Sequence, residues 1–416
     1  MTAPLDVARL RARFPGLARR DGDGTAVFFD GAAGSQVPQS VADAVAHYLL
    51  HDNANTGGTF ATARATEEAL AQAQQAAADW FGADDPNAVV FGPNMTTLTF
   101  MLSRALARTW QRGDEILLTR LDHDANVTPW VRAAAAAGAN VRFVPFTQPD
   151  CALDPDTVRK ALTPRTRLFA FTAASNLVGT LTPVADLVRV ARAASVQTFV
   201  DAVHYAPHQR IDVAAWGCDF AVCSPYKFFG PHAGLLWGRP ELLASLEAEK
   251  VRPAKDTLPH RFMTGTASHE AIVGTTAAID YVADLGREVS GTQLPRRAAL
   301  DAAFAAIVAH ERDLCARLLT GLAALPDVRI VGIAEPARTA ARAPTVAFTH
   351  RRIPARELAQ ALAEHGIYTW GGNAYAVEVT TALGLEPDGV LRAGVLHYNT
   401  PAEVDRMLAV LANLAK

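Results

Sequence analysis

Short apolar segments alternate with segments of helical periodicity through the first two-thirds of the chain. The apolar segments, which we expect to be β-strands, are residues 26–30, 88–94, 114–120, 141–146, 167–175, 197–204, 219–225 and 233–238. Helical patterns follow several of them, for example "MTTLTFMLSRALARTW" and "TPWVRAAAAAG". Apolar strands that alternate with amphipathic helices are typical of a mainly parallel sheet covered by helices on both faces. The pattern therefore predicts an α/β fold whose ligand crevice lies beyond the carboxyl ends of the strands.

The pattern changes after about residue 290. A long expected helix over residues 296–325 leads into short strands and two further helices, an order that is typical of a smaller α+β domain. We therefore predict three parts. An N-terminal helix within residues 1–20 packs with the small domain, residues 21–290 form a large domain, and residues 291–416 form the small C-terminal domain.

Composition narrows the class of partner. The chain has 416 residues, of which 50% are hydrophobic, so it can bury a large core. Its formal net charge is −3 and it contains no basic block, which indicates neither a nucleic-acid partner nor a membrane surface. The N-terminal segment lacks the apolar core of a signal peptide, and no apolar run approaches the roughly 20 residues of a membrane span. We therefore predict a cytoplasmic protein whose partner is a small molecule or another protein.

The cysteines do not indicate a metal site. Cys151, Cys218, Cys223 and Cys315 show neither a CxxC motif nor the Cys/His spacing of metal ligands. We expect free core thiols in a reducing compartment and no bound metal.

Two polar residues follow neighbouring expected strands and suggest a specific chemistry. Lys227, one of only five lysines, follows residues 219–225 in "SPYKFFGPHAG", and Asp201 ends the apolar run "TFVD". Taken alone, an Asp after a strand is most often a helix N-cap. Together, a carboxylate and a lysine at adjacent strand ends suit a pyridine cofactor that carries an aldehyde. The carboxylate would keep the ring nitrogen protonated, and the lysine would form a Schiff base.

These residues lie in segments that resemble the class V aminotransferase family, particularly its cysteine desulfurase-like branch. The similar segments are "FFDGAAGSQVP", "GDEILLTRLDHDANVTPW", "SNLVGTLTPV", "VDAVH", "SPYKFFGPHAGLLWG", "RFMTGTASHE" and "LRAGVLHYNTPAEVDRM". Their order and spacing extend over almost the whole chain. The resemblance implies the fold of type I transferases that depend on pyridoxal 5'-phosphate (PLP), with a mainly parallel seven-stranded sheet in the large domain. It also implies PLP as the cofactor.

The resemblance assigns roles to individual residues. Lys227 would hold PLP as a Schiff base and then shuttle protons at the substrate's Cα atom. Asp201 would pair with the pyridinium nitrogen, and His123 would stack on the ring. We therefore count these three as catalytic. His204 would hydrogen-bond the phenolic oxygen of PLP, and Asn176 would assist there or hold the substrate.

Further residues are implied around the phosphate group. Met95 and Thr96 begin an expected helix, whose N-terminus is a site for anions, and Ser224 would complete the phosphate site. Thr266 corresponds to a residue that reaches the phosphate of the neighbouring subunit, which implies a homodimer. Tyr226 stands where the branch usually has histidine, and we include it in the cofactor site.

The substrate side departs from the branch. Arg392 matches the arginine that clamps an amino-acid α-carboxylate, although by itself it is one of many arginines. The branch carries its nucleophilic cysteine in "RTGHHCA", whereas this chain has "YTWGGNA", with Asn373 at the cysteine position and glycines at both histidine positions. Trp370, Asn373 and Tyr375 are candidates to line the substrate pocket. The alternative for this stretch is a tight Gly-Gly turn before a strand.

The sequence leaves the reaction open. Transamination, β- or γ-elimination including C–S cleavage, and epimerisation all fit PLP chemistry on an α-amino acid, and we predict that no persulfide forms on the protein. A non-catalytic dimeric scaffold that retains the fold is the competing hypothesis. Its only support is the altered cysteine loop, and the complete catalytic set argues against it. The sequence does not identify the amino acid.

Overall fold

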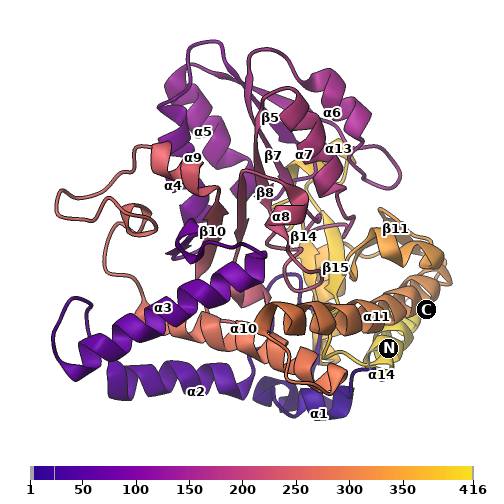
Figure 1. The fold of residues 1–416 in the computed structure, drawn as a ribbon. Helices are drawn as coiled ribbons and strands as arrows, with labels where there is room; N and C mark the ends of the chain where they lie inside the picture. The colour runs from indigo at the N-terminus through magenta and orange to yellow at the C-terminus, as the bar shows by residue number, and fades with distance from the viewer. Residues whose placement is uncertain (1–3, 23, 415–416) are drawn as a thin grey trace.

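The computed structural model describes residues 4–22 and 24–414 (Figure 1). A seven-stranded sheet forms its centre. The strands are β4 (Val89–Gly92), β5 (Glu115–Thr119), β6 (Asn140–Val144), β7 (Thr166–Thr172), β8 (Gln197–Asp201), β9 (Phe220–Cys223) and β10 (Gly234–Gly238). Their order is β4-β10-β9-β8-β7-β5-β6. Strands β9 to β6 pair in parallel, whereas β10 runs antiparallel to both of its neighbours. The predicted α/β fold with a mainly parallel seven-stranded sheet is confirmed.

Helices cover both faces of this sheet (Figure 1). The helices of the chain are α1 (Val7–Arg11), α2 (Gln39–His47), α3 (Ala61–Phe81), α4 (Met95–Ala107), α5 (Thr128–Ala137), α6 (Pro155–Ala161), α7 (Val184–Ala193), α8 (Val213–Trp216), α9 (Pro240–Ser245), α10 (His269–Ser290), α11 (Arg296–Ala323), α12 (Ala355–Glu364), α13 (Val377–Ala382) and α14 (Pro401–Leu414). Within the described ranges, none of the helices has an apolar stretch long enough to cross a bilayer.

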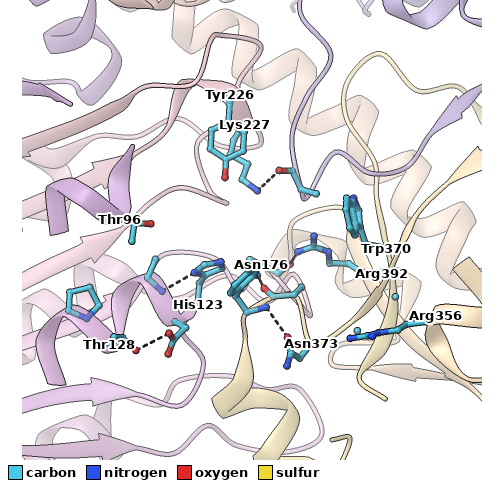
Figure 2. Close-up of a pocket in the computed structure, with 18 of the residues that line it drawn as sticks. Thr96, His123, Thr128, Asn176, Tyr226, Lys227, Arg356, Trp370, Asn373 and Arg392 are labelled. Atoms are coloured by element: carbon cyan, nitrogen blue, oxygen red, sulfur yellow. Dashed lines mark hydrogen bonds between the residues drawn. The ribbon is translucent and has the colours of Figure 1, made fainter. Parts of the chain in front are cut away.

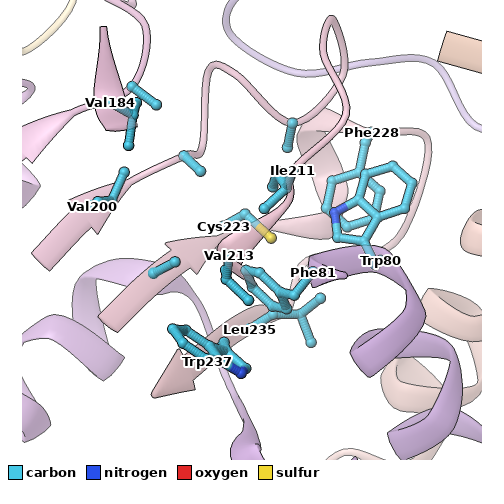
Figure 3. Packing of buried hydrophobic residues seen from close by; sticks show 14 of the residues in the cluster. Trp80, Phe81, Val184, Val200, Ile211, Val213, Cys223, Phe228, Leu235 and Trp237 are labelled. Atoms are coloured by element: carbon cyan, nitrogen blue, oxygen red, sulfur yellow. The ribbon is translucent and has the colours of Figure 1, made fainter. Parts of the chain in front are cut away.

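Successive side chains of a strand enter different cores. In β9, Phe220 packs in the core under α4 and α5, and the next residue, Ala221, packs in the core on the opposite face. Because both faces are buried, these strands are continuous apolar runs rather than alternating ones. Figure 3 shows part of the second core, where Trp80 of α3 stacks on Phe228 with ring centroids 4.2 Å apart. This contact holds the turn that contains Lys227 against the sheet.

A smaller antiparallel sheet forms the second part of the molecule. Its strands are β11 (Val328–Val331), β12 (Thr345–His350), β15 (Val390–Gly394) and β14 (Trp370–Gly372), in that spatial order. A separate core joins this sheet to α11, α12 and α14. This separate core explains why the apolar pattern changes after the long helix.

The segment around residue 30 connects the two parts. Strand β3 (Val27–Phe28) pairs in parallel with β13 (Ile367–Tyr368), and Asp30 forms a β-bridge with Gly394. The apolar run at residues 26–30 therefore lies beside the small antiparallel sheet rather than in the central one. Its partner is more than 300 residues away in the sequence, so local periodicity could not identify it. The remaining strands, β1 (Arg20–Asp21) and β2 (Gly24–Thr25), pair with each other.

The N-terminal segment contacts the last helix. Arg11 of α1 forms an ion pair with Glu403 of α14 at 2.9 Å. Phe14 packs edge-on against Tyr281 of α10, with ring centroids 5.3 Å apart. The segment therefore lies against elements from both parts of the molecule.

The two longest helices cross at a glycine. A Cβ atom on Gly286 of α10 would lie 1.7 Å from the carbonyl oxygen of Ala299 in α11. No side chain fits at that distance, so the glycine permits the close approach of the helices. Since α11 also packs in the core around the small antiparallel sheet, this crossing helps to fix the two parts relative to each other.

We expect Gly286→Ala to lower the free energy of unfolding by about 1–3 kcal/mol, because the added methyl group forces the helices apart. The loss should appear despite the intrinsic helix preference for alanine, which is worth about 1 kcal/mol. Urea unfolding followed by circular dichroism measures it. Gly265→Ala is the control, because a Cβ atom there has nothing within 4 Å. A Gly286→Ala protein as stable as the wild type would contradict the prediction.

Candidate active site

A cavity of about 620 Å³ opens between the carboxyl ends of the central strands and the segment around β14 (Figure 2). A small chamber of about 60 Å³ adjoins it, and Lys227 and Asn176 line both. Of the predicted site residues, the large cavity is lined by Thr96, His123, Asn176, Tyr226, Lys227, Trp370, Asn373 and Arg392, and the small chamber adds Met95, Asp201 and His204. The fold thus brings together side chains that are widely separated in the sequence.

Lys227 lies in a 3₁₀ turn just after β9. Its Nζ atom donates hydrogen bonds to the carbonyl oxygens of Ala32 (2.7 Å) and Ala33 (2.9 Å), and it lies 4.9 Å from the centre of the Tyr226 ring. Burial lowers the pKa of Lys227 to about 7, and the positive charge of Arg392 acts in the same direction. Near neutral pH the amine is therefore divided between its charged and neutral forms. Such a lysine can act as a nucleophile or as a base.

Asp201 ends β8 and is only 4% exposed. Its Oδ1 atom accepts a hydrogen bond from the backbone N–H of Val203 at 2.9 Å. Burial raises the pKa of Asp201 to about 6, while this hydrogen bond and the charge of Lys227 oppose the rise. The carboxylate is therefore mainly ionised at pH 7, and its second oxygen is available to a ligand in the small chamber.

His204 and Asn176 bring unpaired polar atoms to the small chamber. Both ring nitrogens of His204 and the Oδ1 atom of Asn176 are buried and have no hydrogen-bond partner within the described chain. Burial lowers the pKa of His204 well below its ordinary value, so the ring is neutral and carries one donor and one acceptor. Buried polar atoms without a partner are rare in folded proteins. Their arrangement indicates a polar ligand in the chamber.

His123 follows β5 and forms part of the wall of both cavities. Its Nδ1 atom accepts a hydrogen bond from the backbone N–H of Ala125 at 3.0 Å, so the proton lies on Nε2. Burial lowers the pKa of His123 to about 4, assisted by the charges of Lys227 and Arg392. The ring of Tyr375 stacks on the imidazole with centroids 5.4 Å apart. The neutral, flat ring is suited to stacking on an aromatic ligand.

The N-terminus of α4 lies at the edge of the small chamber. Asn94 caps this helix by accepting a hydrogen bond from the backbone N–H of Thr97 at 2.8 Å. The backbone N–H of Met95 donates to Oγ of Ser224 at 3.2 Å. Strand β10 passes so close that a Cβ atom on Gly234 would lie 2.4 Å from the carbonyl carbon of Asn94. The predicted anion-binding group of Met95, Thr96 and Ser224 is therefore assembled in one place.

Arg392 of β15 is a buried cation that borders the large cavity. Its side chain donates a hydrogen bond from NH1 to the backbone carbonyl of Asn176 at 2.7 Å. Burial lowers the pKa of Arg392 to about 10, so the guanidinium remains charged at neutral pH. Its remaining N–H groups can bind a carboxylate through two parallel hydrogen bonds.

The stretch from Trp370 to Tyr375 forms the rim of the cavity. Trp370 is 56% exposed and lies opposite Arg392 in the pairing of β14 with β15. Asn373 donates a hydrogen bond to Glu386 at 3.0 Å and accepts one from the backbone N–H of Tyr375 at 3.1 Å. Both glycines of this stretch belong to or end strand β14, so they do not form the tight turn that was the alternative.

Thr266 is the predicted site residue that lies apart from the others. It borders a second cavity of about 480 Å³, together with His232. The ring of His232 stacks on Tyr226 with centroids 5.1 Å apart, so the second cavity lies behind one wall of the first. A reach from Thr266 to a neighbouring subunit stays a prediction.

Sequence reasoning did not identify three charged residues at the site. Asp30, whose pKa burial raises to about 6, lies close enough to Lys227 and Arg392 to interact with their charges. Asp124 and Arg356 line the large cavity. Asp30 lies in the segment "FFDGAAGSQVP". The resemblance of this segment to the family could have identified Asp30 as a site residue. No signal was available for Arg356, because α12 reaches the cavity only through tertiary packing.

The cysteines lie away from this site. All four are among the described residues and are buried, and none of them lines the large cavity or the small chamber. Burial raises the pKa of Cys151 to about 12 and that of Cys223 well above its ordinary value. These thiols are therefore protonated and enclosed, which does not suit a nucleophile.

Comparison with known proteins gives consistent matches along the chain. The family model described as aminotransferase class-V matches residues 27–407. An aminotransferase-like protein from Gibberella zeae is 32% identical over 421 residues, which cover 99% of this chain and 98% of that protein. A cysteine desulfurase from Serratia proteamaculans is 31% identical over 432 residues, covering 100% and 99%. The apo structure of a cysteine desulfurase from Thermococcus onnurineus superposes with a TM-score of 0.89 at 24% identity, covering 100% of this chain and 99% of that one. The last match confirms the fold that the resemblance implied.

We expect Lys227 in ligand-free protein to be acetylated by acetic anhydride with a midpoint near pH 7, because only the neutral amine reacts and burial lowers this pKa to about 7. An ordinary lysine has a pKa of about 10.4. Isotope-labelled anhydride and peptide mass spectrometry measure the rate relative to the exposed Lys160. Arg392→Gln should move the midpoint to higher pH, since it removes a nearby positive charge. A midpoint close to 10 in the wild type would refute the assignment.

Proposed function

Because the chain belongs to the aminotransferase class-V family, we propose that it is a PLP-dependent enzyme that acts on an α-amino acid, with Lys227 as the residue that binds the cofactor. One observation carries the proposal. A lysine whose pKa is lowered to about 7 and a buried carboxylate, Asp201, line the same small chamber at the end of adjacent strands.

The polar groups of the site fit PLP. Lys227 supplies the amine for the aldehyde, and the free oxygen of Asp201 supplies a partner for the ring nitrogen. The unpaired nitrogens of His204 are available to the phenolic oxygen. The N-terminus of α4 with Ser224 offers N–H and hydroxyl groups to the phosphate. When bound, PLP supplies an electron sink that stabilises negative charge at the substrate's Cα atom.

The residues of the chain would carry out the rest of the chemistry. Lys227 removes or returns a proton at Cα, because its neutral form is accessible near pH 7. Asp201 is ionised above about pH 6 and would accept a hydrogen bond from the ring nitrogen, which keeps that nitrogen protonated. Arg392 binds the α-carboxylate and so fixes the orientation of Cα. His123 covers the ring, and the buried Phe228 next to Lys227 excludes water from one side.

The proposed chemistry does not include a protein persulfide. Asn373 stands at the rim where the resembling segment has a cysteine, and it is held by Glu386 and by the backbone of Tyr375. The enclosed thiols elsewhere are not positioned to replace it. Transamination and elimination, including C–S cleavage, are therefore the reactions that we propose, with epimerisation as the alternative outcome.

Purified protein incubated with PLP should absorb near about 420 nm, as expected for a cofactor bound to a lysine amine. Lys227→Ala should lose this band, because Lys227 is the one lysine among the described residues that line the chamber. Lys160→Ala, a change on the exposed surface of α6, should keep it. Absence of the band in the wild type would refute the proposal.

Product analysis with a panel of amino acids should reveal turnover without any sulfur acceptor. Pyruvate with ammonia indicates elimination, amino exchange that depends on a keto acid indicates transamination, and inversion alone indicates epimerisation. Asp201→Asn should lower kcat by about 100-fold or more, because the neutral amide no longer keeps the ring nitrogen protonated. A loss of this size is typical for a positioned acid–base group. Detection of a persulfide on the protein after incubation with cysteine would contradict this chemistry. A lack of turnover for every amino acid would favour the scaffold hypothesis.

A further inference from the structure

The large cavity contains more positive charge than the proposed chemistry requires. Three basic side chains line it, Lys227, Arg356 and Arg392, against a single carboxylate, Asp124. Asp124 is already engaged, because it accepts a hydrogen bond from the hydroxyl of Thr128 at 2.8 Å. In the proposed function, Lys227 binds the cofactor and Arg392 binds the α-carboxylate. Arg356 is left without a role.

The position of Arg356 is not explained by stability. It is the second residue of α12, where the positive end of the helix dipole disfavours a cation. Its side chain forms no ion pair or hydrogen bond with residues 4–22 and 24–414. Two neighbouring arginines behave differently, since Arg351 and Arg352 both pair with Asp327, at 3.1 and 3.0 Å. Arg356 is also exposed, but unlike these two neighbours it lines the large cavity and has no carboxylate beside it in the described part of the chain.

The backbone of β14 places this arginine at the cavity. A Cβ atom on Gly371 would lie 2.4 Å from the carbonyl oxygen of Ala355 and 2.8 Å from the Cα atom of Arg356. A Cβ atom on Gly372 would lie 3.9 Å from Nε of Arg356. The two glycines thus allow the start of α12 to lie directly against β14. Any side chain at residue 371 would displace the helix and Arg356 with it.

We propose that Arg356 binds a second anionic group at the distal end of the substrate, which makes the substrate an amino acid with an acidic side chain. The inference rests on the proposed function, because it assumes that Arg392 holds the α-carboxylate. Figure 2 shows Arg356 and Arg392 on the same side of the cavity, with Trp370 beside Arg392. A substrate held at both ends by arginines packs its carbon chain against this aromatic wall.

Matched acidic and neutral amino acids test the proposal on the PLP-loaded protein. The pairs are aspartate with asparagine and glutamate with glutamine, and cysteate and O-phosphoserine are each compared with serine. Dissociation constants come from calorimetry and, independently, from changes in the cofactor absorbance. At least one acidic member should bind about tenfold or more tightly than its neutral partner, as a charge-assisted pair of hydrogen bonds provides.

Arginine variants test whether Arg356 causes the preference for acidic amino acids. Arg356→Gln should reduce the ratio to about one, and Arg356→Lys should retain part of it, because the charge remains without the planar fork. Arg351→Gln, which changes an exposed arginine that does not line the cavity, should keep the wild-type ratio.

Three results would overturn the inference. In the first, the wild type prefers no acidic amino acid. In the second, Arg356→Gln keeps both the preference and the wild-type affinities. In the third, Arg356→Gln weakens the binding of acidic and neutral amino acids equally. The last result would place Arg356 at the α-carboxylate instead. Each of these leaves the cofactor band intact and so leaves the proposed function standing, whereas failure to bind PLP at all removes both.

Discussion

Two hydrogen bonds join Lys227 to a segment almost 200 residues earlier in the chain. Its amine donates to the carbonyl oxygens of Ala32 and Ala33, and the same segment forms a β-bridge to β15 through Asp30. The fit is close, since a Cβ atom on Gly394 would lie 2.5 Å from the backbone nitrogen of Ala32. Lys227, in the turn after β9 of the central sheet, and β15, which carries Arg392, are therefore both held against this strip of backbone.

Burial determines the charge state of the site as much as the partners do. It lowers the pKa of Lys227 and raises that of Asp201 until both lie near neutrality. Each shift makes the folded state less stable near pH 7 than it would be with an unshifted pKa. The two unpaired buried nitrogens of His204 lower the stability further. Groups arranged in this way favour a bound ligand, because a ligand supplies the partners that the chain does not.

The sequence predicted the central strands and the site residues that directly follow them, because both depend on local patterns of apolar and polar residues. Apolar runs located the central strands, because strands buried on both faces have no polar residues to interrupt them. The residues that follow these strands, such as Asp201 and Lys227, were identified because parallel strands bring their ends to one edge. The pairing of β3 with β13 and the approach of Arg356 to the cavity could not be predicted. Both depend on packing between segments that are distant in the sequence.

Gly371 of β14 also limits which substitutions the site can accept. At residue 371 the space for a side chain is filled by the backbone of α12, not by another side chain. A neighbouring side chain can be exchanged by one mutation, but a helix start cannot be moved by one. A histidine at residue 371 would therefore be accommodated only together with changes that move the start of α12.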